Sequence, residues 1–267
     1  MEVEAIVVEQ SIPRALEKFW HRADAAERRG YLVAALLLVS GLIHLAVLVI
    51  SGGSWQGPLS FRKPATFGLS FGITLFTIVW VSRFLKLGTR ARSVLLTGFT
   101  AASVLETALV SLQTWRGVPS HFNVETGFDA WVARGLAGGG VALVAMIVVL
   151  TVAAFRSNSE VPISMRIAIR TGFIALCGAM AVGATMIGRG MVLVFSGNPE
   201  AAYWTGGALK PMHAVMMHGV LVLPALAWLL SFARWSEPRR AKVLLAASCA
   251  YVLVIAIVAF RNLVGLL

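Results

Sequence analysis

Charged residues are scarce in this chain. They make up 13% of its 267 residues, against about 25% in an ordinary soluble domain. Acidic residues are the rarer kind, with 12 Asp and Glu against 23 Lys and Arg. A charged fraction this low excludes an ordinary soluble globular protein. The basic excess does not indicate a nucleic-acid-binding protein, because the Lys and Arg residues are divided among the short stretches between apolar runs.

Cysteine is rare, and the short motifs of several common chemistries are missing. Cys177 and Cys249 both fall inside apolar runs, which excludes a disulfide framework or a zinc ribbon and is typical of buried cysteine acting as a small hydrophobic residue. The chain contains no CxxCH for covalent haem attachment, no GxxxxGK[ST] phosphate loop and no HExxH zinc motif. None of these motifs therefore indicates a particular reaction, and function has to be inferred from the placement of polar residues.

Apolar residues are what the chain has in excess: 58% of the residues are hydrophobic and the mean hydropathy is +0.82. Runs of about 20 apolar residues cross a bilayer as helices, because every backbone polar group must be bonded within the segment. The sequence predicts an all-α integral membrane bundle of seven transmembrane helices over residues 30–267, with no second domain. The expected spans are Tyr31–Ile50, Thr66–Leu85, Ser93–Gln113, Trp131–Phe155, Ile167–Phe195, Met212–Phe232 and Lys242–Leu263.

Lys and Arg residues are more numerous before the first span and in the second, fourth and sixth connections than in the other connections. Cytoplasmic connections of membrane proteins carry such an excess. We therefore expect a multi-pass protein of the inner (cytoplasmic) membrane, with a cytoplasmic N-terminus and an extracytoplasmic C-terminus. No pattern predicts the oligomeric state.

Residues 1–29 are predicted to form a cytoplasmic amphipathic segment. They lack the basic start, short apolar core and small-residue cleavage site of a signal peptide. Ser11 and Pro13 are typical of a helix start, and apolar and charged positions then alternate at helical spacing. We expect a helix on the inner membrane surface, and a frayed polar tail is the alternative.

The three connections expected on the outer side, 51–65, 114–130 and 196–211, are longer than the inner ones and carry aromatic residues such as Trp55, Trp115 and Phe122. Part of this aromatic content is expected at the membrane interface. The rest favours ordered lids over the outer mouth of the bundle.

Four polar side chains are predicted at one depth in the outer half of the bilayer. His44, Glu106, Arg189 and His218 lie six or seven residues from the outer ends of their spans, which is roughly 9–11 Å at the helical rise. An ionisable group inside a span is costly and favours a functional site that faces the bundle interior. We expect the four to line one pocket open toward the outer face. Nearer the mouth we expect His213, Arg62, Lys63, Arg134, Lys210 and Arg261.

Each member also has a purely structural interpretation. A lone His44 is more often a hydrogen-bonded interior histidine than a ligand, and Glu106 could pair with Arg189 as a structural ion pair. Arg62 and Lys63 could mark an ordinary helix start with snorkelling cations.

The leading hypothesis for the pocket is a redox or electron-transfer protein that holds haem b. Two neutral imidazoles on different helices can clamp iron axially, and His44 with His218 fits this by depth, with His213 as a competing ligand. Arg189, Arg62, Lys63 or Arg261 would then face the propionates, and arginine suits them because the guanidinium fork binds both oxygens of a carboxylate.

Three alternatives stay open. A zinc-dependent membrane hydrolase would use His44, His218 and either His213 or Glu106, with Glu106 as ligand or general base; however, His213 and His218 are five residues apart and do not share a helix face. Copper would suit the mixed methionine and histidine content of Met212–His218. Without a metal, the cationic residues would bind an anionic lipid or a quinone head group, or the protein would have a transport or structural role.

Three stretches, Ser60–Pro64, Gln113–Asn123 and Lys210–His218, resemble stretches in an uncharacterised family of bacterial polytopic membrane proteins. That resemblance implies a membrane bundle and no particular activity. The seven-span topology is also similar to that of ceramidase and adiponectin-receptor membrane hydrolases. Their histidine pair at i and i+4 is not matched by His213 and His218, so no residue role is carried over.

Overall fold

The computed structural model describes residues 20–205, 207 and 209–264 of the protein. Within these residues there are seven helices long and apolar enough to cross a membrane, and no strand. The predicted all-α seven-helix bundle is confirmed. Of the amphipathic segment predicted over residues 1–29, residues 1–19 fall outside the described residues, and residues 25–29 belong to the first long helix. The long helices are α3 (Ala25–Ile50), α4 (Arg62–Ser82), α5 (Thr89–Trp115), α6 (Gly127–Phe155), α7 (Ile163–Phe195), α9 (Lys210–Ser231) and α10 (Glu237–Val264), with the short α8 (Pro199–Thr205) before α9.

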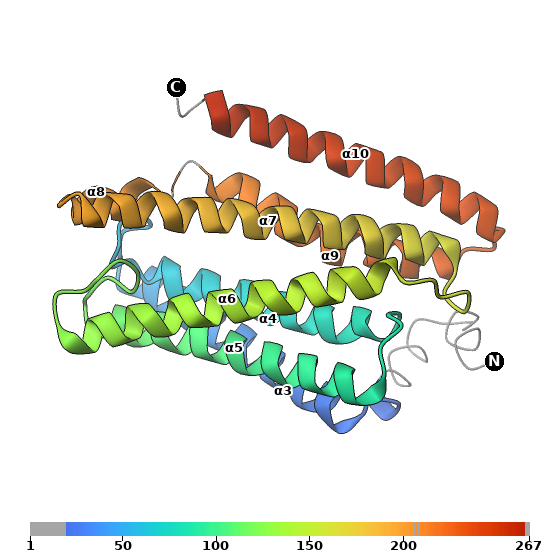
Figure 1. The fold of residues 1–267 in the computed structure, drawn as a ribbon, viewed down its shortest axis with the longest axis horizontal. Helices are drawn as coiled ribbons and strands as arrows, with labels where there is room; N and C mark the ends of the chain where they lie inside the picture. The colour runs from blue at the N-terminus through green and yellow to red at the C-terminus, as the bar shows by residue number, and fades with distance from the viewer. Residues whose placement is uncertain (1–19, 206, 208, 265–267) are drawn as a thin grey trace.

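Successive long helices run in opposite directions, so their connections gather at the two ends of the bundle (Figure 1). The long-loop end, on the left of Figure 1, carries connections 51–61, 116–126 and 196–209. The short-loop end, on the right, carries connections 83–88, 156–162 and 232–236. Helix α3 begins at the short-loop end and α10 ends at the long-loop end.

The first membrane helix begins at Ala25, earlier than its predicted span. Asp24 accepts a hydrogen bond from the Glu27 amide and Glu27 accepts one from the Asp24 amide, both at 2.9 Å, which is the reciprocal capping box of a helix start. Arg83, which ends α4, donates to both carboxylate oxygens of Glu27 at 3.0 and 2.9 Å. This buried ion pair fixes the start of α3 against the end of α4 at the short-loop end.

Helices α3 and α4 approach so closely that their backbones touch. A Cβ placed on Gly68 would lie 2.6 Å from the Gly41 nitrogen, and one placed on Gly72 would lie 2.9 Å from the Ala34 carbonyl oxygen. Small residues permit this approach between helices in lipid, where packing rather than water exclusion drives association.

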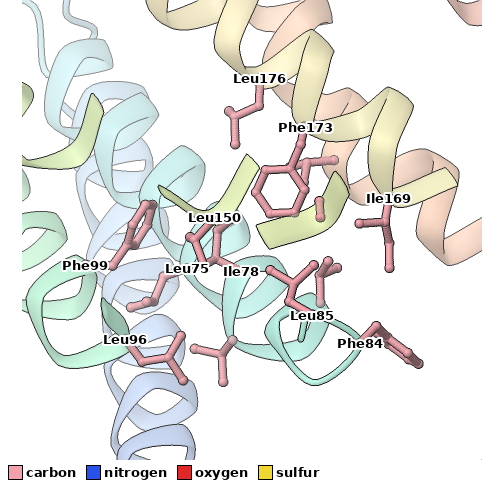
Figure 2. Packing of buried hydrophobic residues seen from close by; sticks show 14 of the residues in the cluster. Leu75, Ile78, Phe84, Leu85, Leu96, Phe99, Leu150, Ile169, Phe173 and Leu176 are labelled. Atoms are coloured by element: carbon pink, nitrogen blue, oxygen red, sulfur yellow. The ribbon is translucent and has the colours of Figure 1, made fainter. Parts of the chain in front are cut away.

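The apolar core lies between α4, α5, α6 and α7, toward the short-loop end. Figure 2 shows Ile78 of α4, Phe99 of α5, Leu150 of α6 and Phe173 of α7 among its members. The polar side chains of interest therefore occupy the other half of the bundle, nearer the long-loop end.

Helix α10 lies at the edge of the bundle, where it packs on α7 and α9 (Figure 1). Its outward side exposes Leu253, Ile257 and Phe260. An apolar face of this size on a spanning helix is lipid-facing surface.

Candidate functional site

The four side chains predicted at one depth do not form one cluster. His44 on α3 and Glu106 on α5 are buried, with 6% and 5% of their surface exposed. His218 on α9 is partly buried and Arg189 on α7 is exposed. No hydrogen bond, ion pair or ring contact joins any two of them among the described residues, and the ion pair considered for Glu106 and Arg189 does not form.

Both ring nitrogens of His44 form hydrogen bonds. Its Nδ1 donates to the Ser40 carbonyl oxygen one turn earlier in α3, at 2.7 Å, so Nε2 is the acceptor nitrogen. The indole Nε1 of Trp115, the last residue of α5, donates to that Nε2 at 3.1 Å. Phe61 stacks against the imidazole with ring centroids 6.3 Å apart. This arrangement corresponds to the structural interpretation of His44 as a hydrogen-bonded interior histidine.

Glu106 faces the neighbouring helix α6. A Cβ placed on Gly139 would lie 2.5 Å from Glu106 Oε1, so glycine is what leaves room for the carboxyl group. Oε1 is fully buried and has no hydrogen-bond partner. The carboxyl group thus lies between α5 and α6, on a different surface of α5 from the Trp115 contact to His44.

His213 is also held by a hydrogen bond. Its Nδ1 donates to the Ala179 carbonyl oxygen of α7 at 2.7 Å, beside Gly183, whose lack of a side chain accommodates the imidazole. Nε2 of His213 has no hydrogen-bond partner among the described residues, and neither ring nitrogen of His218 has one. Over the same residues, no three His, Cys, Asp or Glu side chains lie close enough together to hold a metal ion.

A basic cluster does form at the long-loop end, from segments far apart in the chain. Its members are Arg62 and Lys63 in the first turn of α4, and Lys210, which starts α9. Lys63 lies within electrostatic range of both Arg62 and Lys210, and Arg62 within range of Lys210. In the part of the chain that the structure describes, none of these three side chains has a carboxylate partner.

The backbone around the basic cluster is already satisfied. At the start of α4 the Arg62 amide donates to Ser60 Oγ and the Lys63 amide to the Ser60 carbonyl oxygen, at 3.1 and 2.9 Å. At the start of α9 the Met212 amide donates to Asn262 Oδ1 of α10 at 3.0 Å. Neither first turn contains an acidic residue, although a helix N-terminus favours negative charge. Both helix starts therefore add positive potential to the cluster without offering free amides.

Arg62 is held in one orientation. Its Nε donates to the Trp55 carbonyl oxygen at 2.8 Å, and the guanidinium lies 5.9 Å from the centroid of the Trp55 ring. The two terminal nitrogens of Arg62 have no hydrogen-bond partner among the described residues. That leaves the planar fork which binds two oxygens of one anion.

His121, in connection 116–126, adjoins Lys63. Its ring contacts the rings of Phe67 and Phe122, with centroids 5.9 and 6.2 Å apart. Burial, and after it the positive charge of Lys63, lowers the pKa of His121 well below its usual value. His121 is therefore neutral near pH 7 and adds a hydrogen-bonding group, not a charge, beside the cations.

A buried carboxylate fixes connection 116–126 over the bundle. Asp129, 2% exposed, accepts hydrogen bonds from Gln113 Nε2 at 2.9 Å, Arg116 Nη1 at 2.6 Å and Thr126 Oγ1 at 2.6 Å. Arg116 also donates to Gln113 Oε1. These contacts join the end of α5 to the start of α6 and hold both ends of the connection.

Phe122 lies at the turn of the same connection. Its φ of 65° is unusual for a residue with a side chain, and its ring occupies the space that a Cβ on Gly190 of α7 would need. Nearby, burial and the charge of Glu125 raise the pKa of Tyr203 on α8. The connection predicted to be an ordered lid is thus packed against α7 through Phe122.

Comparison of the chain with protein-family models, with curated proteins and with solved structures finds no match. The resemblance of Ser60–Pro64, Gln113–Asn123 and Lys210–His218 to a bacterial membrane-protein family therefore stays a prediction. The structure does bring parts of these three stretches together, since they contribute Lys63, His121 and Lys210 respectively.

Gly68-Leu69-Ser70-Phe71-Gly72 matches the spelling of the GxSxG nucleophile elbow. That motif requires a sharp turn between a strand and a helix, with the serine exposed at the turn. Residues 68–72 instead lie within α4, and both glycines pack against α3. The stretch is a helix-packing element and indicates no serine hydrolase.

Proposed function

We propose that this membrane protein binds an anionic group, a phosphate or a carboxylate, at its long-loop end through Arg62, Lys63 and Lys210. One observation carries the proposal: three cations lie within range of one another, and no carboxylate among the described residues pairs with any of them. Like charges held together repel, and the repulsion grows as the surroundings become less polar. A bound anion relieves that repulsion.

Two other arginines of this protein form ion pairs with carboxylates of the same chain. Arg83 binds Glu27 and Arg116 binds Asp129, and both carboxylates are buried. Among the described residues the basic cluster has no such carboxylate, although Arg62 is equally well oriented by Trp55. This contrast supports an external anion in place of an internal one.

Side chains would hold the anion, because the nearby backbone amides are used. The terminal nitrogens of Arg62 supply a bidentate contact, and Lys63 and Lys210 supply point charges. His121, neutral and flanked by Phe67 and Phe122, places aromatic surface beside the charged group. The arrangement suits a ligand with an anionic head and an apolar part, such as an anionic lipid or an acidic quinone-like molecule.

Thermal unfolding of the purified protein in mixed detergent and lipid tests the proposal. Phosphatidylglycerol should raise the unfolding temperature more than phosphatidylcholine does, and the difference should shrink with salt because exposed charge interactions are screened. Lys63→Gln and Arg62→Gln should each weaken binding by roughly tenfold, the equivalent of about 1.4 kcal/mol. Lys86→Gln, an exposed lysine of the short-loop end, is the matched control and should behave as the wild type does.

The same assay separates the two sources of the anion. If inorganic phosphate alone reproduces the stabilisation and competes with phosphatidylglycerol, the ligand is a soluble anion. If only the lipid acts, the ligand is membrane-embedded. If phosphatidylglycerol and phosphatidylcholine raise the unfolding temperature equally, and Lys63→Gln does not change this result, the proposal is wrong.

A haem b or other metal cofactor is the second candidate, and one observation favours it. His213 donates through Nδ1 to a backbone carbonyl and leaves Nε2 without a partner, which is the arrangement that metal-bound histidines use. His44 is less suited, since Trp115 occupies its Nε2. A Soret band or stoichiometric metal in the purified protein, lost in His213→Ala and kept in His44→Ala, would support this candidate.

The proposal places the long-loop end on the extracytoplasmic side of the inner membrane. The support is the excess of Lys and Arg at the short-loop end, which is typical of the cytoplasmic side. A periplasm-active reporter fused after Leu267 should be active, and a cytoplasm-active reporter fused there should be silent. The reverse result would reverse the orientation.

A further inference from the structure

Among the described residues, three acidic side chains are almost completely buried, and they fall into two kinds. Glu27 is bound by Arg83 through both oxygens, and Asp129 is bound by Arg116, Gln113 and Thr126. Glu106 is buried to a similar degree, with 5% of its surface exposed. It has neither a cation nor a hydrogen-bond donor on Oε1.

The surroundings of Glu106 are apolar. One turn away along α5 lies Val110, which forms a small buried cluster with Val132 and Leu136 of α6. Across the interface the carboxyl group faces the Gly139–Gly140 stretch of α6, where the Gly140 backbone is its hydrogen-bond partner. Ser103, one turn earlier on α5, donates its hydroxyl to the Phe99 carbonyl oxygen at 2.8 Å.

No charged group of the neighbouring helices compensates Glu106. In the half of the bundle near the long-loop end, α3, α4 and α6 carry five titratable or charged groups that could face α5, and Arg116 follows the end of α5 itself. None of these groups forms an ion pair or hydrogen bond with Glu106; the five are His44, Arg62, Lys63, Asp129 and Arg134.

We infer that Glu106 is a proton-binding site within the membrane, and that the folded protein holds it as the neutral carboxylic acid near pH 7. A carboxylate without a cation beside it is disfavoured inside a bilayer far more than its protonated form, because the neutral acid needs no counter-ion. Protonation adds one hydrogen to one carboxylate oxygen and raises the net charge of the protein by one. The inference is independent of the anion proposed for the basic cluster.

The glycine opposite the carboxyl group gives the site a specific geometry. Gly139 alone among Gly138, Gly139 and Gly140 would bring a Cβ against Glu106, since the other two face open space. The interface between α5 and α6 is therefore shaped around this carboxyl group, and a side chain at residue 139 displaces it. This makes Gly138→Ala the matched control for Gly139→Ala.

Infrared spectroscopy of the full-length protein in detergent tests the inference. At neutral pH the wild type should show the carbonyl stretch of a protonated carboxylic acid, which shifts in D₂O and gives way to carboxylate bands as the pH rises. Glu106→Gln should lack that band. Gly139→Ala should shift its frequency or its titration, and Gly138→Ala and Lys63→Gln should leave it unchanged.

The result that overturns the inference is a neutral-pH spectrum without a protonated-acid band, or with one that Glu106→Gln retains. If Glu106→Gln does not fold, Glu106→Asp keeps a carboxyl group and should move the band rather than remove it. Because Lys63→Gln leaves the band in place, failure of the anion-binding proposal and failure of the proton site give different results.

Discussion

The indole nitrogen of Trp115 donates a hydrogen bond to Nε2 of His44 over 3.1 Å, and so joins the end of α5 to α3 near the long-loop end. The imidazole completes its hydrogen bonding within α3, where Nδ1 donates to the Ser40 carbonyl oxygen. Both nitrogens are therefore used inside the protein. His44 fixes the position of α3 against α5, next to the α4 start that carries the basic cluster.

Trp115→Phe keeps an aromatic ring beside Phe61 but removes the donor to His44. A buried acceptor left without its donor costs about 1–3 kcal/mol, so the unfolding temperature should fall. Denaturation monitored by circular dichroism measures this. Trp131→Phe, an exposed tryptophan of the same end, should change stability little; equal effects of both substitutions would contradict a specific role for the hydrogen bond.

Asp129→Asn tests whether the carboxylate holds connection 116–126. The variant replaces charge-assisted hydrogen bonds by weaker neutral ones and removes the partner of Arg116. Limited proteolysis should then cut the connection faster than in the wild type. Glu125→Gln, an exposed acid in the same connection, should leave the cleavage rate unchanged, and a rate that does not rise in Asp129→Asn would count against the contact.

Gly68→Ala should destabilise the contact between α3 and α4. The new Cβ would meet the Gly41 backbone at 2.6 Å, and backbone cannot move aside as a flexible side chain can. Overpacking of this kind costs roughly 1–3 kcal/mol. Gly188→Ala on α7 adds a Cβ where nothing lies within 4 Å, and it should keep or slightly raise stability, because alanine favours helix over glycine. Thermal unfolding of the two variants side by side provides the comparison.

Because the pKa of His121 is lowered in the folded protein, we expect the stability of the protein to depend on pH. Its pKa is lowered in the folded protein by burial and then by Lys63, whereas the unfolded chain has a histidine pKa of about 6.5. Below that pH the unfolded state binds a proton that the folded state does not, so stability falls as the pH falls. His121→Gln should flatten the curve of unfolding temperature against pH below about 6.5. Parallel curves for variant and wild type would show that His121 does not contribute.

The helices could be predicted from the sequence because about 20 apolar residues leave the backbone no other solution in a bilayer. The start of α3 was missed although Asp24 and Glu27 have the spacing of a capping box, because the charge of Glu27 is balanced by Arg83, which lies on another helix. A local pattern does not contain that partner.

The candidate site was predictable in part. Depth along a span follows from counting residues, and His44, Glu106 and His218 do lie within the bundle. Rotation about each helix axis depends on packing, and it leaves Arg189 exposed and turns Glu106 toward α6. The positions of His121 and Trp115 depend on connection 116–126, whose course includes the positive φ of Phe122; only their aromatic and polar character could be noticed in the sequence.

Native mass spectrometry of the protein released from detergent with bound lipid is the most direct test of the anion-binding site. Wild-type protein should retain at least one phosphatidylglycerol in preference to phosphatidylcholine, and the double variant Arg62→Gln/Lys63→Gln should lose that preference. The control Lys86→Gln/Arg90→Gln removes the same charge from the short-loop end and should keep it. Loss of the preference in the control, or its survival in Arg62→Gln/Lys63→Gln, would contradict a binding site at the basic cluster.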